Sequence, residues 1–183
     1  MMARFNRWVN ARIYDSVAKL SDEQYRKDVG LFFGSVHATL NHLLLVDILW
    51  TRRLRGEPNG FKSLTDIVED DFADLRRARV AEDDRFIEQV ERMTPADLDR
   101  PIVYTRMLGS GQEEVRARHI LATLNNHQTH HRGQVHAALT QAGIEPPALD
   151  VIYFLEEIGE SGEAGTLRPR SLASKTQCSC LPA

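Results

Sequence analysis

Apolar residues recur at helical spacing in four long stretches of this chain, separated by breaks that contain glycine and proline. A repeat near 3.6 residues predicts amphipathic helices, here over residues 3–20, 35–55, 65–93 and 117–141. Gly56 and Gly143 follow two of these stretches, and glycine is the commonest residue just past a helix end. Four long amphipathic helices predict an all-α protein with the architecture of a four-helix bundle.

Shorter elements are predicted between and after these helices. Ser21 and Gln24 form a capping-box pattern, which begins a short turn or helix. Residues with a preference for strands flank the turn sequence GSG at 109–111 and predict a short β-hairpin before the last long helix. The apolar sequence LDVIYFLEE predicts a short helix after the final bundle helix. We therefore expect one bundle domain over residues 1–158.

The C-terminal residues have a different composition. Residues 159–183 are rich in Gly, Ser and Pro and poor in large apolar side chains, which predicts a tail outside the core. We expect this tail to be dispensable for the stability of the domain. It contains both cysteines of the chain, Cys178 and Cys180, which are one residue apart and poorly placed to bridge each other.

Composition and charge narrow the functional classes. A chain of 183 residues can bury a large core without metal or disulfide support, so a bound metal would serve function rather than folding. The net charge of −3 argues against a nucleic-acid binder that works through bulk charge. A local basic cluster, Arg52, Arg53 and Arg55, is explained by its place at a helix C-terminus, where cations favour the helix dipole.

The expected cellular compartment is the cytoplasm. The N-terminal sequence has no apolar signal-peptide core, and the longest apolar run is too short and too interrupted to span a membrane. The two closely spaced cysteines provide no disulfide framework of the kind found in secreted domains. We therefore expect neither a membrane nor a nucleic-acid partner.

Four of the seven histidines fall in the sequence LNNHQTHHRGQVH, residues 124–136. On a helical wheel His131 lies within the apolar stripe of its helix and His127 at the margin, whereas His130 and His136 point elsewhere. Two inward-facing imidazoles one turn apart are suited to binding a single metal ion in a bundle core. The same pattern also arises in a hydrogen-bonded core pair or on a solvated face. His119, like His130 and His136, is expected at the surface.

A third ligand would have to come from another helix. The predicted helix at 35–55 contains His37 and His42. Apolar residues occur on almost every face of this helix, so periodicity does not show which of the two histidines points into the bundle. Asp47 on the same helix has two interpretations, as the partner of an arginine or backbone group, or as a carboxylate that orients a ligand histidine. Gln134 could line a pocket beside the histidines. No convincing general base is present, and no sequence pattern supports Asp47, Gln134 or Tyr104 in that role.

Three segments of the chain together resemble the DinB/YfiT-like family, a group of metal-binding four-helix bundles. They are FNRWVNARIYDSV near the start, GSVHATLNHLLLVDILWTRRLRG, and NNHQTHHRGQVHAALTQAG, and the resemblance covers residues 3–157. It implies one metal ligand in LNHLL, which is His42, and two in HQTHHRGQ, which are His127 and His131. The resemblance thus selects His42 over His37.

The resemblance also implies a function. Some members of the family transfer or isomerise groups with low-molecular-weight thiols such as bacillithiol, mycothiol or glutathione, and others are described as metal-dependent hydrolases. We therefore expect a bound divalent ion, either zinc or nickel, and a small-molecule substrate such as a thiol. We also expect a homodimer, and the apolar helix at 35–55 offers surface for the contact between the two chains.

The leading hypothesis is a metalloenzyme of the S-transferase or hydrolase class. Three imidazoles leave a coordination position open for a thiol or water. The alternative is a non-catalytic, metal-bound stress-response or binding protein. An enzyme should show an apolar pocket open to solvent beside His42, His127 and His131, and a structural site should be closed.

Overall fold

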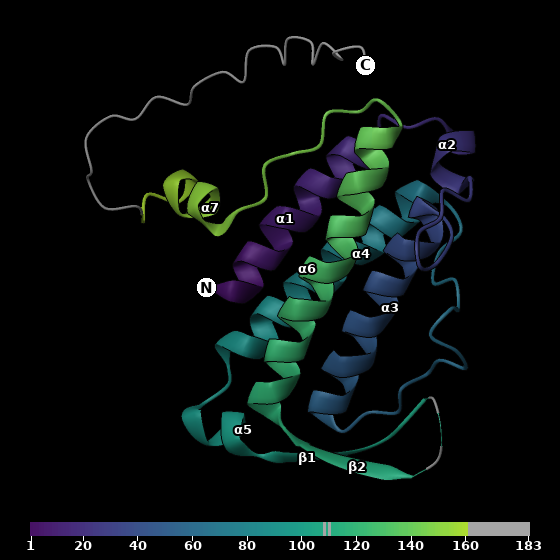
Figure 1. Ribbon diagram of the computed structural model, residues 1–183. Helices are drawn as coiled ribbons and strands as arrows, with labels where there is room; N and C mark the ends of the chain where they lie inside the picture. The colour runs from purple at the N-terminus through teal and green to yellow at the C-terminus, as the bar shows by residue number, and fades with distance from the viewer. Residues whose placement is uncertain (108, 110, 161–183) are drawn as a thin grey trace, which may run out of the picture.

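Four long helices form the bundle, and short elements cover its ends (Figure 1). The computed structural model describes residues 1–107, 109 and 111–160. Within these residues the helices are α1 (Met2–Val17), α2 (Asp22–Arg26), α3 (Val36–Arg55), α4 (Phe72–Glu91), α5 (Pro95–Asp99), α6 (Ala117–Gln141) and α7 (Val151–Glu157), and the strands are β1 (Pro101–Thr105) and β2 (Gln112–Arg116). The predicted all-α bundle with a small hairpin is confirmed. The predicted tail lies almost wholly outside the described residues, as do both cysteines.

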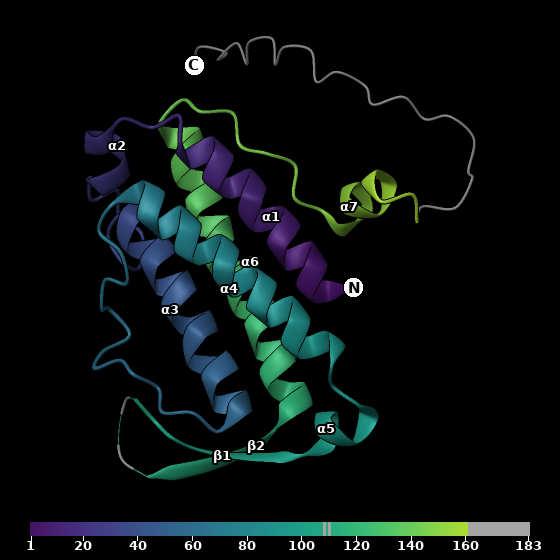
Figure 2. The same cartoon turned by 180° about the vertical axis from the view of Figure 1, so that it is seen from behind.

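Each long helix packs chiefly against two others. Helices α1 and α3 both contact α4 and α6, so the four enclose a core that consists of two clusters of buried apolar residues. Side chains such as Ile13, Leu44 and Leu139 are completely or almost completely buried in that core. The hairpin crosses one end of the bundle, and α7 lies outside α1 (Figures 1 and 2). No helix in the described part of the chain has both the length and the apolar composition needed to cross a membrane.

Local sequence signals explain several element boundaries. The Ser35 side chain accepts a hydrogen bond from the Ala38 amide and begins α3, which ends at Gly56 with a left-handed φ of 73°. Such a φ favours glycine because other residues carry a Cβ that crowds the backbone there. The predicted capping box at Ser21 is present, and β1 and β2 pair antiparallel as expected.

The third long helix begins later than predicted. It starts at Phe72, not at Thr65, and residues 56–71 form a connection along α3. The Asn41 side chain in α3 accepts hydrogen bonds from the backbone amides of Val68 (2.8 Å) and Glu69 (3.0 Å), which fixes this connection to α3. Asp71 then caps the helix. Ile67, expected on the inner side, is consequently 47% exposed.

The apolar surface of α3 is covered within a single chain. The four consecutive residues Leu43 to Val46 are all buried, and so are Leu49 and Leu54. The excess apolarity of this helix therefore reflects its contacts with α4, α6 and β1. It does not provide the additional surface for a second chain that the sequence suggested.

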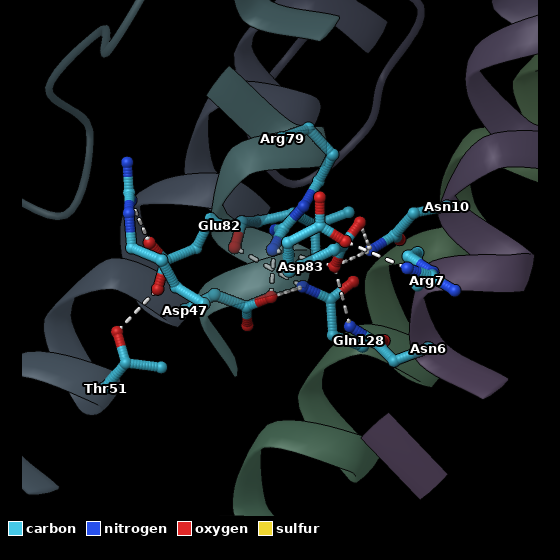
Figure 3. Close-up of polar contacts among 12 residues, drawn as sticks. Asn6, Arg7, Asn10, Asp47, Thr51, Arg79, Glu82, Asp83 and Gln128 are labelled. Carbon is cyan, nitrogen blue, oxygen red and sulfur yellow. Dashed lines mark hydrogen bonds and ion pairs between the residues drawn. The ribbon is translucent and has the colours of Figure 1, made fainter. Parts of the chain in front are cut away.

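Charged side chains meet in the middle of the bundle (Figure 3). Arg79 of α4 lies 2.8 Å from the Asp47 carboxylate of α3 and 3.0 Å from that of Asp83. Gln128 of α6 donates a hydrogen bond of 2.7 Å to Asp47. Asn10 of α1 donates one of 2.9 Å to Asp83. All four long helices therefore contribute to one buried polar network.

A second arginine balances the charge of this network. Arg132 of α6 is 4% exposed and donates hydrogen bonds to the side-chain oxygens of Asn6 (2.8 Å) and Asn10 (3.2 Å). With Arg79 it matches the two carboxylates of Asp47 and Asp83, so the fully ionised network is neutral. Burial raises the pKa of Asp47 to about 6, and the neighbouring Arg79 opposes that rise.

Two adjacent residues test the importance of this network. Asp83 is buried and ion-paired, whereas Asp84 forms an exposed pair with Arg7. Asp83→Ala should lower the free energy of unfolding by about 3–5 kcal/mol, because it removes one of the two carboxylates that pair with the buried Arg79 and leaves the network with an uncompensated positive charge. Asp84→Ala should lower it by less than about 1 kcal/mol. Urea unfolding of both variants measures the difference, and equal effects would contradict a stabilising role for the buried network.

Candidate metal centre

Three histidines from two helices converge at one side of the bundle. His42 lies on α3, and His127 and His131 lie one turn apart on α6, which packs against α3. One ring nitrogen from each residue lies within 4.8 Å of the other two. The Nε2 atoms of His42 and His127 are 3.0 Å apart. The structure therefore brings together the three residues that the sequence singled out.

Hydrogen bonds orient two of the three imidazoles. The Nδ1 atom of His42 lies 2.8 Å from the carbonyl oxygen of Leu64, and Nδ1 of His131 lies 2.8 Å from the side-chain oxygen of Gln134. Because both partners are acceptors, each Nδ1 carries the hydrogen and each Nε2 presents a lone pair. Phe33 stacks on the His42 ring, with centroids 3.8 Å apart.

Burial keeps this cluster uncharged. It lowers the pKa of His42 to about 4, and the hydrogen bond to Leu64 acts in the opposite direction. Burial, followed by the proximity of His131 and His42, lowers the pKa of His127 to about 3. Burial also lowers the pKa of His131. All three rings are therefore neutral at pH 7, which is the form that binds a metal ion.

The donor set fits a divalent metal ion. The Nε2 atoms of His42 and His127 are 3.0 Å apart, a separation that requires a hydrogen or a cation between them. Two imidazoles on one tetrahedral zinc ion, with bonds of roughly 2.0–2.1 Å, would hold their nitrogens about 3.3 Å apart. The hydrogen bonds to Leu64 and Gln134 are the kind of outer contacts that fix ligand histidines in metal sites.

The other histidines lie elsewhere. His37 is buried against Tyr25 and lies 3.4 Å from Asp70, on another part of α3. His119 and His130 are exposed, as expected. His136 is half-buried, and its Nε2 lies 3.2 Å from the carbonyl oxygen of Pro147.

The three polar residues that the sequence suggested near the site, Asp47, Gln134 and Tyr104, have different contacts. Asp47 pairs with Arg79 and Gln128 in the buried network, so its interpretation as an arginine partner holds and it orients no ligand histidine. Gln134 holds the His131 ring. Tyr104 lines the hollow beside the histidines.

An apolar hollow opens beside the three histidines. Its volume is about 460 Å³, and His42, His127 and His131 form part of its wall. Much of the remaining wall is apolar and includes Leu49 and Leu64. None of the described residues that line it is acidic. The site therefore faces a pocket and is not enclosed by protein.

Sequence reasoning missed several residues of this pocket. Phe32 and Phe33 lie in a tight turn that closes with a 2.8 Å hydrogen bond from the Gly34 amide to the Leu31 carbonyl. Leu64 belongs to the connection between α3 and α4. None of these loop residues has a periodic signal, so only the fold places them beside the histidines.

Arg53 is also a pocket residue. The cluster Arg52, Arg53 and Arg55 was explained by the helix dipole, but Arg53 turns inward and is 9% exposed. Its guanidinium carbon lies 4.4 Å from the ring centroids of both Trp50 and Tyr104. The dipole argument therefore does not account for this arginine.

A four-helix bundle with three converging histidines beside an open pocket defines the class of protein. The chain belongs to the DinB family, whose model matches residues 1–163. It is similar to Protein DinB of Bacillus subtilis (strain 168), with 26% identity over 160 residues that cover 82% of this chain and 90% of that protein. The resemblance seen in the sequence is thus confirmed.

Solved structures of DinB-like proteins have the same fold. One from Bacillus subtilis matches with a TM-score of 0.62 over 81% of this chain and 97% of its own. One from Bacillus cereus ATCC 10987 matches with a TM-score of 0.59 over 77% and 90%, respectively. Both are 18% identical to this chain, so the likeness concerns the fold alone.

Metal content of single variants tests the centre. His42→Ala, His127→Ala and His131→Ala should each lose most of the bound metal, because each removes one of three protein ligands. The measurement is elemental analysis of protein purified without an affinity tag or added metal, at one pH for all variants, since protons compete for the imidazoles.

Three further histidine variants serve as controls. His130→Ala is the strictest, because it neighbours His131 in sequence but lies outside the cluster. His37→Ala and His136→Ala should also retain metal. If His130→Ala lost metal while His127→Ala kept it, the assignment of ligands on α6 would be wrong.

Proposed function

We propose that this protein is a metalloenzyme that activates a thiol at a divalent ion held by His42, His127 and His131. The observation that carries the proposal is the open, mainly apolar hollow beside the three histidines. A structural metal site needs no such opening, whereas a catalytic site needs room for a substrate beside the metal. Zinc and nickel both suit three imidazole ligands.

The surroundings of the site favour a thiol over water as the activated group. Bound there, a divalent ion would lower the pKa of a thiol or of a water molecule. Hydrolysis by a metal-activated water commonly also uses a carboxylate as a general base, and the described lining of the hollow contains none. The apolar wall suits the organic part of a thiol and excludes water from it.

The protein residues have separate roles in this proposal. The carbonyl of Leu64 and the side chain of Gln134 hold two imidazole rings in the orientation that ligation requires. Phe33 covers one face of His42 and shields it from solvent. Tyr104 is the one hydroxyl group among the described lining residues and is a candidate donor to a substrate.

Thiol ligation is testable by spectroscopy. Protein loaded with cobalt(II) should show a new, saturable near-ultraviolet absorption when 2-mercaptoethanol is added, because thiolate ligands transfer charge to the metal. The His136→Ala protein should respond like the natural protein, since His136 lies outside the cluster. A fully cobalt-loaded protein without any response would favour the alternative, a non-catalytic metal-bound protein.

Turnover is a separate measurement. Glutathione and 1-chloro-2,4-dinitrobenzene form a sulfur–carbon bond with loss of chloride and a proton, and the product is followed by its absorbance. We expect zinc- or nickel-loaded protein to accelerate this reaction and His131→Ala to lose the acceleration. Faster hydrolysis of p-nitrophenyl acetate without thiol transfer would instead favour the hydrolase class.

We also propose a homodimer, on the basis of the family resemblance. Light scattering at micromolar concentration should then give twice the mass of one chain. The mass of a single chain would contradict this proposal without affecting the metal site, because all three histidines come from one chain.

A further inference from the structure

We propose that Arg53 binds the carboxylate of an elongated, otherwise apolar substrate whose reacting end lies at His42, His127 and His131. This inference rests on the proposed function, because it specifies the substrate of the same pocket. Arg53 lines the hollow together with the three histidines. The hollow, of about 460 Å³, falls within the size range of small-molecule sites.

The position of Arg53 along α3 sets the length of this substrate. His42 and Arg53 are eleven residues apart on one helix, so they share nearly the same direction and lie about 16 Å apart along its axis. Val46 and Leu49 lie between them and also line the hollow. The metal centre and the guanidinium thus occupy the two ends of one apolar wall.

Among the residues that the structure describes, Arg53 is a buried cation without a carboxylate partner. Within the described residues no carboxylate oxygen lies within 4.0 Å of its guanidinium. Among the described residues, the guanidinium makes one hydrogen bond, which Nη2 donates to the Thr105 carbonyl at 2.9 Å. By contrast, the buried Arg79 has two carboxylates, and the neighbouring Arg55 pairs with Glu57. A buried charge without a counter-ion is costly, so a ligand that supplies one would bind favourably.

Two aromatic rings, those of Trp50 and Tyr104, pack closely against the guanidinium group of Arg53. Trp50 and Tyr104 pack edge to face, with centroids 5.0 Å apart, and the guanidinium carbon lies 4.4 Å from each. Tyr104 comes from β1, which crosses the end of α3 (Figure 1). These contacts and the Thr105 carbonyl fix the guanidinium in place. Its remaining N–H groups can donate two parallel hydrogen bonds, which suits a planar carboxylate.

The charges around the hollow agree with an anionic ligand. Its described lining contains two arginines, Arg53 and Arg106, and no acidic residue. Arg106 already pairs with Glu113 at 2.8 Å. A second hollow that Arg53 also lines includes Glu57, whose carboxylate makes it less suited to an anion. The first hollow therefore combines an apolar body with one cationic end.

Two matched probes test the proposal. 4-Phenylbutanoate carries the carboxylate and 4-phenylbutanamide is its neutral analogue, and neither has a thiol. Calorimetric titration of the zinc-loaded protein should give tighter binding of the carboxylate. Arg53→Met should weaken carboxylate binding by about tenfold or more, the effect of losing a hydrogen bond to a charged group, and should leave amide binding unchanged. Arg53→Lys should keep part of the preference.

Arg52→Met is the matched control. Arg52 neighbours Arg53, but its side chain donates to the Asn59 carbonyl outside the hollow that contains the histidines. If Arg52→Met and Arg53→Met weakened carboxylate binding equally, the effect would come from the net charge of the protein, and the proposal would be overturned. A carboxylate preference that persists in Arg53→Met would place the anion elsewhere, at the metal, and would overturn it too. Equal weakening of both probes would assign Arg53 a packing role only.

Metal content and thiol ligation are measured on the same proteins. Arg53→Met should hold as much zinc as the natural protein, because Arg53 lies outside the histidine cluster. The probes do not react, so their binding does not depend on whether the protein activates a thiol. A protein that prefers the carboxylate but ligates no thiol would therefore contradict the proposed function and leave the role of Arg53 supported.

Discussion

The buried polar network around Arg79, Asp47 and Asp83 constrains how the four long helices fit together, because Asn10 of α1 and Gln128 of α6 donate hydrogen bonds to its two carboxylates. Charged groups in a core cost several kcal/mol each to desolvate, so they are tolerated only where their partners meet in good geometry. Apolar contacts allow many relative positions of two helices, whereas these polar contacts allow few. We infer that the network sets the register of the bundle.

Residues of this network are adjacent to the three histidines of the candidate metal centre. Gln128 lies between His127 and His131 on α6, and its side chain donates to Asp47 and, at 3.4 Å, to the carbonyl of Leu43. Leu43 immediately follows His42 on α3. The contact that aligns α3 with α6 is therefore next to the clustered histidines on both helices. A shift of one turn along α6 would separate the imidazoles.

The same bundle creates two contrasting electrostatic environments. Around Asp47, the buried charged side chains form ion pairs of opposite charge. On the His42 side, burial among aromatic and apolar groups keeps three imidazoles neutral, so protons compete weakly with a metal ion at pH 7. Arg53 lies at the edge of the second environment without a carboxylate partner among the described residues, and this difference from Arg79 gives it a role in binding.

The sequence by itself determined the helices and the pair on α6. Periodicity places His127 and His131 together because residues four apart share one helix face, a consequence of backbone geometry alone. The choice of His42 over His37, by contrast, depends on how α3 packs, and the sequence reached it only through family resemblance. The tertiary structure also decided the start of α4, because the Asn41 side chain fixes Val68 and Glu69 of the preceding connection to α3. It turned Arg53 inward and brought Phe33 and Leu64 to the site, since contacts between residues distant in the chain follow from packing and have no local pattern.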